Sequence, residues 1–136
     1  MGRGKVIVLD TCVLIFDAIA KEKLSLSAKK AISSGEEKKQ LFCCDISVWE
    51  IAMLIQKKRL NVIIGIQDFL NLILKARQID VLDITPDIAE LSVTHPSFLH
   101  YDPADRIIAA TTIHHNAKLV TCDQQLANLD GLEVIW

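Results

Sequence analysis

Several features that would quickly assign a protein to a class are missing from this sequence of 136 residues. No apolar run approaches the roughly 18 residues of a membrane-spanning helix. The first residues lead into an apolar stretch that is too short for a signal peptide. The formal net charge is −2, which excludes a general electrostatic attraction for nucleic acid. We therefore expect a soluble, cytoplasmic protein without membrane contact, in which any handling of RNA depends on local basic residues and metal ions.

The cysteines lack the spacing of a metal-binding framework. Cys12, Cys122 and the adjacent pair Cys43-Cys44 lie in apolar, strand-like surroundings. Neither their separations nor the adjacent pair matches a zinc site. We predict that they are small buried thiols in a reducing compartment.

What is present is the composition of an ordinary globular domain. Hydrophobic residues make up 51% of the chain and charged residues 24%, a typical balance for a folded protein. The length is sufficient for one hydrophobic core. No repeat, linker or low-complexity segment divides the sequence, so residues 1–136 are predicted to form a single domain.

Short apolar runs rich in β-branched residues alternate with segments of helical periodicity. We expect strands at residues 5–9, 41–44, 81–84, 118–121 and 133–135. Helices are expected at residues 12–20, 25–34, 47–58, 64–77, from 85 to about 95, and from 103 onward. The second helix is expected to end at Ser33-Ser34-Gly35. This alternation predicts an α/β fold, with a central parallel sheet flanked by helices on both faces.

Acidic residues stand close to the ends of the predicted strands. Asp10 directly follows the first strand, and Asp123 comes shortly after the strand at 118–121. Glu50 lies on the helix after the second strand, and Asp105 is the third residue of the helix that Pro103 opens. In an open parallel sheet, ligands bind beyond the carboxyl ends of the strands. The four acids are therefore predicted to meet along one edge.

Each acid also has a purely structural explanation. Asp10, Asp102 and Asp123 suit helix N-caps, and the spacing from Ser47 to Glu50 is that of a capping box. Taken singly, these explanations are the favoured ones. Taken together they lose ground, because crowded carboxylates raise one another's pKa unless a cation neutralises them. Four acids at one edge favour a divalent-metal site.

The metal predicted for such a site is Mg²⁺ or Mn²⁺, because oxygen ligands suit hard cations and no histidine or cysteine joins the predicted cluster. Phosphodiester hydrolysis is the chemistry that paired divalent ions serve best. Thr11, Ser47 and Thr121 supply hydroxyl groups that can orient a carboxylate, a water or a phosphate.

Four segments resemble the four motifs of PIN-domain ribonucleases. They are residues 8–12 (Val-Leu-Asp-Thr-Cys), 47–52 (Ser-Val-Trp-Glu-Ile-Ala), 100–111, which begins His-Tyr-Asp-Pro-Ala-Asp-Arg, and 119–123 (Leu-Val-Thr-Cys-Asp). The Trp-Glu and Asp-Pro-Ala-Asp-Arg sequences are most similar to the small VapC-type toxins of bacteria and archaea. The resemblance covers essentially the whole chain and implies the PIN fold. It also implies that Asp10, Glu50, Asp105 and Asp123 are the metal-binding, catalytic acids, with Asp102 as a cap or a ligand through water.

The same resemblance implies an Mg²⁺- or Mn²⁺-dependent endoribonuclease that is the toxin of a toxin–antitoxin pair. Proteins of this type are homodimers neutralised by an antitoxin, whose tail occupies a groove beside the site. Two alternatives stay open: a PIN nuclease of RNA processing that is not a toxin, and a PIN-fold binding module without activity. A response-regulator receiver is less favoured, because it leaves Glu50 without a role.

Three further features allow two interpretations each. Arg106 is equally suited to contacting an RNA phosphate and to pairing with Glu50 or Asp102. The basic residues 57–59 can hold RNA, but a favourable interaction with the helix dipole is the preferred explanation. Trp49 can stack on a base, yet its apolar neighbours predict a place in the core.

Overall fold

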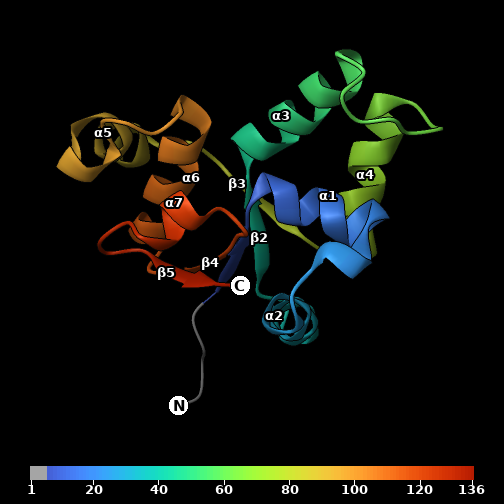
Figure 1. The fold of residues 1–136 in the computed structure, drawn as a ribbon, viewed down its shortest axis with the longest axis horizontal. Helices are drawn as coiled ribbons and strands as arrows, with labels where there is room; N and C mark the ends of the chain where they lie inside the picture. Colours follow the sequence, from blue (N-terminus) through green and yellow to red (C-terminus); the bar gives the residue numbers. More distant parts are fainter. Residues whose placement is uncertain (1–5) are drawn as a thin grey trace.

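The protein, described here for residues 6–136 in a computed structural model, is built on a five-stranded parallel sheet (Figure 1). The strands are β1 (Ile7–Leu9), β2 (Leu41–Cys44), β3 (Asp80–Leu82), β4 (Lys118–Val120) and β5 (Glu133–Ile135). Their order is β3-β2-β1-β4-β5. All five predicted strands are present, within two residues at each end. Residue 5, which was assigned to the first strand, lies outside the described residues.

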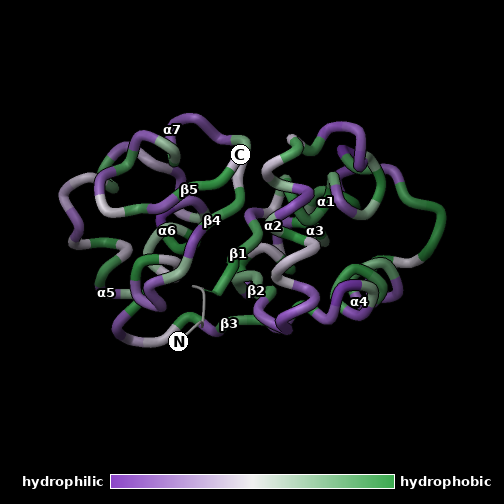
Figure 2. Tube along the Cα trace, turned by 90° about the horizontal axis from the view of Figure 1, so that it is seen from below, coloured by the Kyte–Doolittle hydropathy of each residue, from purple (hydrophilic) through white to green (hydrophobic). Residues whose placement is uncertain are grey.

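Seven α-helices flank the sheet in the part of the chain that is described. They are α1 (Thr11–Ile19), α2 (Leu26–Glu37), α3 (Asp45–Gln56), α4 (Ile66–Ala76), α5 (Pro86–Thr94), α6 (Pro103–His114) and α7 (Gln124–Ala127), with single 3₁₀ turns η1 (Lys21–Lys23) and η2 (Pro96–Phe98). Helices α1, α2 and α4 lie on one side of the sheet and α5, α6 and α7 on the other (Figures 1 and 2). The predicted α/β fold with helices on both faces is confirmed. Among residues 6–136, no helix combines the length and apolar character needed to cross a bilayer.

The central strand β1 is buried on both faces, which explains its continuous run of apolar residues. Ile7 and Leu9 join the core that includes α1, α2 and α4. Val8, between them, joins the core under α5 and α6. Because successive side chains of a strand point to opposite faces, one strand supplies both cores.

The order of the strands reverses beside β1. The chain passes from β1 to β2 and β3 on one side, then returns to β4 and β5 on the other. All four neighbouring pairs are parallel, so the carboxyl ends of β1, β2 and β4 lie at the same edge. Helices α1 and α3 and the short α7 follow directly from these ends.

Helix α2 corrects one prediction. It continues through Gly35 to Glu37 instead of ending at residue 34. A Cβ atom on Gly35 would lie 2.5 Å from Cδ2 of the buried Leu41. Gly35 therefore allows the helix to approach β2 closely and does not terminate it.

The start of α3 corrects a second prediction. The helix begins at Asp45, with Cys44 at the N-cap position and no side-chain cap. Ser47 and Glu50 consequently lie inside the helix, and the predicted capping box is wrong. The short helix α7 was not predicted, because four residues are too few to show helical periodicity.

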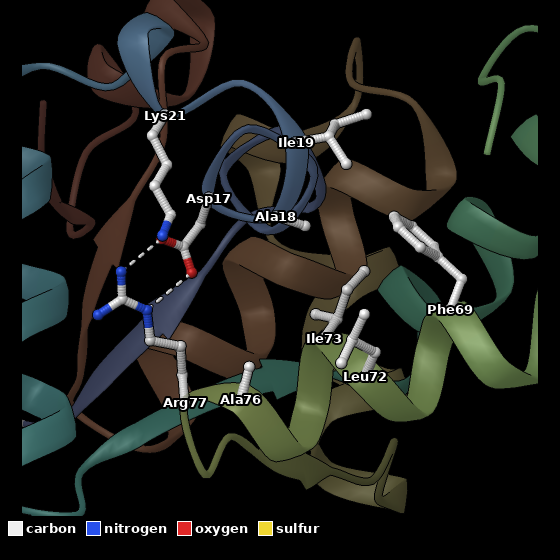
Figure 3. A pocket seen from close by; sticks show the side chains of 9 residues that line it. All are labelled: Asp17, Ala18, Ile19, Lys21, Phe69, Leu72, Ile73, Ala76 and Arg77. Atoms are coloured by element: carbon white, nitrogen blue, oxygen red, sulfur yellow. Dashed lines mark hydrogen bonds and ion pairs between the residues drawn. The ribbon is translucent and has the colours of Figure 1, made fainter. Parts of the chain in front are cut away.

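Arg77, the residue after α4, connects three helices through its guanidinium group. Its Nε and Nη2 atoms donate to the two carboxylate oxygens of Asp17 at 3.1 and 2.8 Å. Its Nη1 atom donates to Glu36 Oε1 at 2.8 Å. Figure 3 shows Arg77 and Asp17 at the edge of a pocket of about 270 Å³ between α1 and α4. Asp17 is only 8% exposed, so its negative charge depends on this partner.

Replacing Arg77 with methionine is expected to lower the free energy of unfolding by about 2 kcal/mol, because a nearly buried carboxylate loses its charged partner. Urea unfolding monitored by circular dichroism measures this change. Glu36→Gln is the control: it removes only the more exposed contact and is expected to cost less than about 1 kcal/mol. Equal effects of the two variants would show that Asp17 does not depend on Arg77.

Candidate metal centre

An open cavity of about 360 Å³ lies at the carboxyl ends of the central strands. Its lining contains all four predicted acids, together with hydroxyl, thiol and apolar groups: Asp10, Thr11, Cys12, Ile15, Glu50, Leu54, Asp105, Cys122 and Asp123. Within residues 6–136, this lining includes no lysine, arginine or histidine. The structure therefore brings the four acids together, while their roles as metal ligands stay a prediction.

Asp10 is the most deeply placed acid of the cavity, with 6% of its surface exposed. It caps the start of α1, where its Oδ1 accepts a hydrogen bond of 2.8 Å from the backbone N–H of Thr11. Its Oδ2 accepts a bond of 2.5 Å from the hydroxyl of Thr121. Burial raises the pKa of Asp10 above its usual value, and the charge of Asp123 adds to the rise, against the opposing effect of these two hydrogen bonds.

Thr121 connects the ends of β1 and β4. Its hydroxyl donates to Asp10 and accepts from the backbone N–H of Asp123 at 3.0 Å. Asp123 then caps α7, with its Oδ1 accepting from the N–H of Gln125 at 2.9 Å. The buried Thr121 hydroxyl therefore donates its single proton to the carboxylate of Asp10 and, as an acceptor, positions the backbone of Asp123.

Glu50 reaches the cavity from α3 and is held by Thr11. The Thr11 hydroxyl lies 2.6 Å from Glu50 Oε1 and 2.8 Å from Ser47 Oγ. A hydroxyl has one proton, so if Thr11 donates to the carboxylate, Ser47 can donate to Thr11. Burial raises the pKa of the half-buried Glu50; the Thr11 hydrogen bond opposes this, and the charges of Asp10 and Asp102 add to it.

Asp105 lies in the first turn of α6 and has the strongest perturbation among the acids. Burial, followed by repulsion from Asp10, Asp123, Asp102 and Glu50, raises its pKa to about 7. The contribution of these carboxylates to the shift is consistent with the convergence of the four predicted acids on the cavity. Asp102 occupies the N-cap position of α6, as predicted, but its side chain makes no capping hydrogen bond.

Arg106 does not pair with Glu50 or Asp102. Its Nε atom donates to the carbonyl oxygen of Tyr101 and its Nη2 atom to that of Leu99, both at 2.8 Å. The guanidinium group therefore shapes the turn before α6. The predicted ion pair is wrong, and a contact with phosphate stays untested.

Cys12 and Cys122 were predicted to be buried thiols outside the acid cluster, and this is wrong: both are partly exposed and lie in the cavity wall. The Sγ atoms of Cys12 and Cys122 lie 3.2 Å apart, and burial followed by the charge of Asp10 raises the pKa of Cys12. Cys12 and Cys122 each lie within two residues of a predicted acid in the sequence. This proximity was the signal that could have placed them in the cavity wall. Cys43 and Cys44 are buried, as predicted.

Trp49 was predicted to lie in the core and is instead 58% exposed. It is the neighbour of Glu50 on α3, and successive residues of a helix face different directions. Because Glu50 turns toward the cavity, Trp49 faces solvent.

Comparison with known proteins agrees with this arrangement. The sequence matches the PIN domain family over residues 7–132. The chain belongs to the PIN domain family. Ribonuclease VapC22 of Mycobacterium tuberculosis is 34% identical over 120 residues, which cover 88% of each chain.

Solved structures share the PIN fold with this chain at low sequence identity. VapBC of Salmonella typhimurium bound to DNA superposes with a TM-score of 0.70 at 16% identity, covering 96% of this chain and 97% of the other. VapBC2 of Rickettsia felis bound to a DNA fragment from the promoter superposes with a TM-score of 0.69 at 18% identity, covering 95% of this chain and 96% of the other. A toxin–antitoxin complex of Klebsiella pneumoniae superposes with a TM-score of 0.62 at 22% identity, covering 93% of this chain and 94% of the other.

The donor groups of this PIN domain fit a hard divalent cation. The lining offers carboxylate and hydroxyl oxygens, the ligands that Mg²⁺ and Mn²⁺ prefer, with no basic side chain to neutralise them. It also contains the thiols of Cys12 and Cys122, but burial raises the pKa of Cys12 and so disfavours the thiolate that would bind a metal. Among residues 6–136, no three acidic, histidine or cysteine side chains are gathered closely enough to hold an ion as they stand. Coordination of one cation by three of these acids would therefore require some of their side chains to turn toward one another.

The raised pKa of Asp105 predicts how metal-free stability depends on pH. The folded state disfavours the ionised carboxylate of Asp105. The contribution of this residue to the free energy of unfolding is therefore greatest below the pKa of about 4 that it has in the unfolded chain, and it falls as pH rises toward about 7. Asp105→Asn removes this contribution. Because Asp105 is only half-buried, solvent screening reduces the expected gain at pH 8 to about 1 kcal/mol.

Urea unfolding in EDTA between pH 4 and pH 8 tests this expectation. The exposed residue Asp130 provides the control, and Asp130→Asn is expected to follow the wild-type protein. A stability difference between Asp105→Asn and wild type that stays constant across this range would contradict the assignment.

Proposed function

We propose that this PIN domain is an endoribonuclease that hydrolyses RNA phosphodiester bonds with Mg²⁺ or Mn²⁺, and that it is the toxin of a toxin–antitoxin pair. The observation that carries the proposal is the convergence of four carboxylates from distant parts of the chain on one cavity. The similarity to a protein named Ribonuclease VapC22 supports the activity. The fold shared with VapBC complexes supports an antitoxin partner.

The proposal includes three statements about organisation. Residues 1–136 form one PIN domain, in agreement with the match over residues 7–132. The protein forms a homodimer. An antitoxin protein binds it and neutralises its activity.

In this proposal, Asp10, Glu50, Asp105 and Asp123 hold the divalent cation. Mg²⁺ or Mn²⁺ supplies positive charge for the scissile phosphate and lowers the pKa of a bound water. Asp10 is fixed by the Thr11 N–H and the Thr121 hydroxyl, so it provides a rigid ligand. Glu50 is oriented by Thr11, which Ser47 contacts in turn.

The charge of the cavity explains why the proposed reaction requires a metal. The acids repel the phosphate groups of RNA, and the cavity lining contains no basic side chain that could attract them. With the carboxylates compensated by a cation, the phosphate can approach. Asp102 does not line the cavity, but its charge repels those of Glu50 and Asp105. It therefore adds to the attraction for the cation.

Asp10→Asn and Asp105→Asn are expected to reduce RNA cleavage by about a hundredfold or more, because loss of a direct ligand exceeds the 10- to 100-fold effects of removing groups that only orient ligands. Cleavage of total cellular RNA with Mg²⁺ or Mn²⁺ and with EDTA measures this. Asp130→Asn is the matched control. Wild-type rates in either site variant, or undiminished cleavage in EDTA, would refute the proposed roles.

Mg²⁺ or Mn²⁺ is expected to raise the melting temperature, because the cation binds the folded state and relieves repulsion among its acids. At a hundred times the dissociation constant, the stabilisation is about 2.7 kcal/mol. Differential scanning calorimetry with increasing metal measures the shift. Asp10→Asn should remove most of it; a shift that persists in this variant would indicate binding elsewhere.

A further inference from the structure

A second hollow lies next to the acidic cavity. Its volume is about 390 Å³, near the lower end of the range for small-molecule sites. It is lined by residues of the turn before α6 and by residues of α7 and its C-cap: Ser97, His100, Tyr101, Gln125 and Asn128. None of them is an acid, a lysine or an arginine.

The wall of this hollow is firmly attached to the candidate metal centre. The Tyr101 hydroxyl donates to the carbonyl oxygen of Gln125 at 2.7 Å, which ties the turn to α7. Arg106 holds the same turn through the carbonyl oxygens of Leu99 and Tyr101. Asp123, one of the four acids, caps α7 by accepting from the N–H of Gln125. The hollow and the acidic cavity therefore share α7, which Asp123 caps and Gln125 belongs to, and meet again around the start of α6, where Tyr101 precedes the helix and Asp105 lies in its first turn.

The groups in the hollow suit a planar, uncharged, hydrogen-bonding ligand. The amides of Gln125 and Asn128 each carry donors and an acceptor, as the edges of nucleobases do. Tyr101 and His100, which also line the hollow, carry rings of the kind on which bases stack. A phosphate would find no lysine or arginine there. A neutral base matches the lining better than the backbone of the RNA does.

We propose that this hollow binds one nucleobase of the RNA beside the scissile phosphate, and that Gln125 and Asn128 help to select which base it is. This inference rests on the proposed ribonuclease function and deepens it. Since Gln125 and Asn128 are exposed and their side chains hold no other part of the described chain, they are free to contact a ligand.

The test compares Gln125→Ala and Asn128→Ala with Gln124→Ala. Gln124 lies on the same helix and is exposed, but it does not line the hollow. A randomised single-stranded RNA pool is cleaved with Mn²⁺ and the cleavage ends are sequenced. Both pocket variants are expected to lose base preference at one position next to the cut. They should also raise KM for a preferred RNA by about three- to tenfold with little change in kcat, whereas Gln124→Ala behaves as wild type.

A second measurement does not depend on cleavage. The same pool, transcribed with 4-thiouridine, is irradiated with the Asp10→Asn variant, and the crosslinked peptides are mapped. Crosslinks to the segments around Tyr101 and Gln125 support the proposal.

The outcomes separate this proposal from the proposed function. If the wild-type protein cuts no RNA with either metal, the proposed function fails and this inference fails with it. If the wild type cuts, but both pocket variants keep its base preference and KM, only the nucleobase site is refuted. Crosslinks that map only outside residues 97–101 and 124–128 would refute it equally.

Discussion

The arrangement of the site depends on one buried carboxylate, that of Asp10. A charge removed from water is unfavourable unless hydrogen bonds or a cation compensate it. Here the backbone N–H of Thr11 and the hydroxyl of Thr121 provide part of that compensation. They come from α1 and from the end of β4, which pairs with β1. The strand order that reverses beside β1 therefore places both partners and the carboxylate at one point.

Neutral groups, and not basic residues, hold the acids in place. Thr11 and Thr121 bind Glu50 and Asp10 through hydroxyls, which fix the carboxylates without cancelling their charge. Arg106, the neighbour of Asp105 in the sequence, donates instead to backbone carbonyls, and Arg77 forms its ion pair with Asp17 near the other end of α1. No basic side chain therefore offsets the carboxylates in the cavity lining, and burial together with their mutual repulsion raises the pKa of Asp105.

The convergence of the acids could be predicted from the sequence because it follows from topology: parallel strands end at one edge, Asp10, Asp105 and Asp123 stand close to a strand end or helix start, and Glu50 lies on the helix that directly follows β2. Features set by tertiary packing could not. Gly35 looked like a helix end because its contact with Leu41 is invisible in the sequence. The Ser47–Glu50 spacing fits a capping box, yet α3 begins earlier and both side chains turn to Thr11. Trp49 is an apolar residue on a largely apolar helix, but its side chain lies on an exposed face of α3.

The net charge of −2 limits how such a protein can bind RNA. Most nucleic-acid binding depends on basic surfaces that replace the counterions of the phosphates. Without that contribution, affinity must come from local basic residues, from a cation at the proposed metal centre, and from contacts that need no charge. Stacking and hydrogen bonding to bases provide such contacts. The neutral hollow, lined by amide and aromatic side chains and built in part on the helix that Asp123 caps, would supply contacts of this kind to the proposed ribonuclease. It also links affinity to selectivity, because the groups that would bind the base are those that distinguish one base from another.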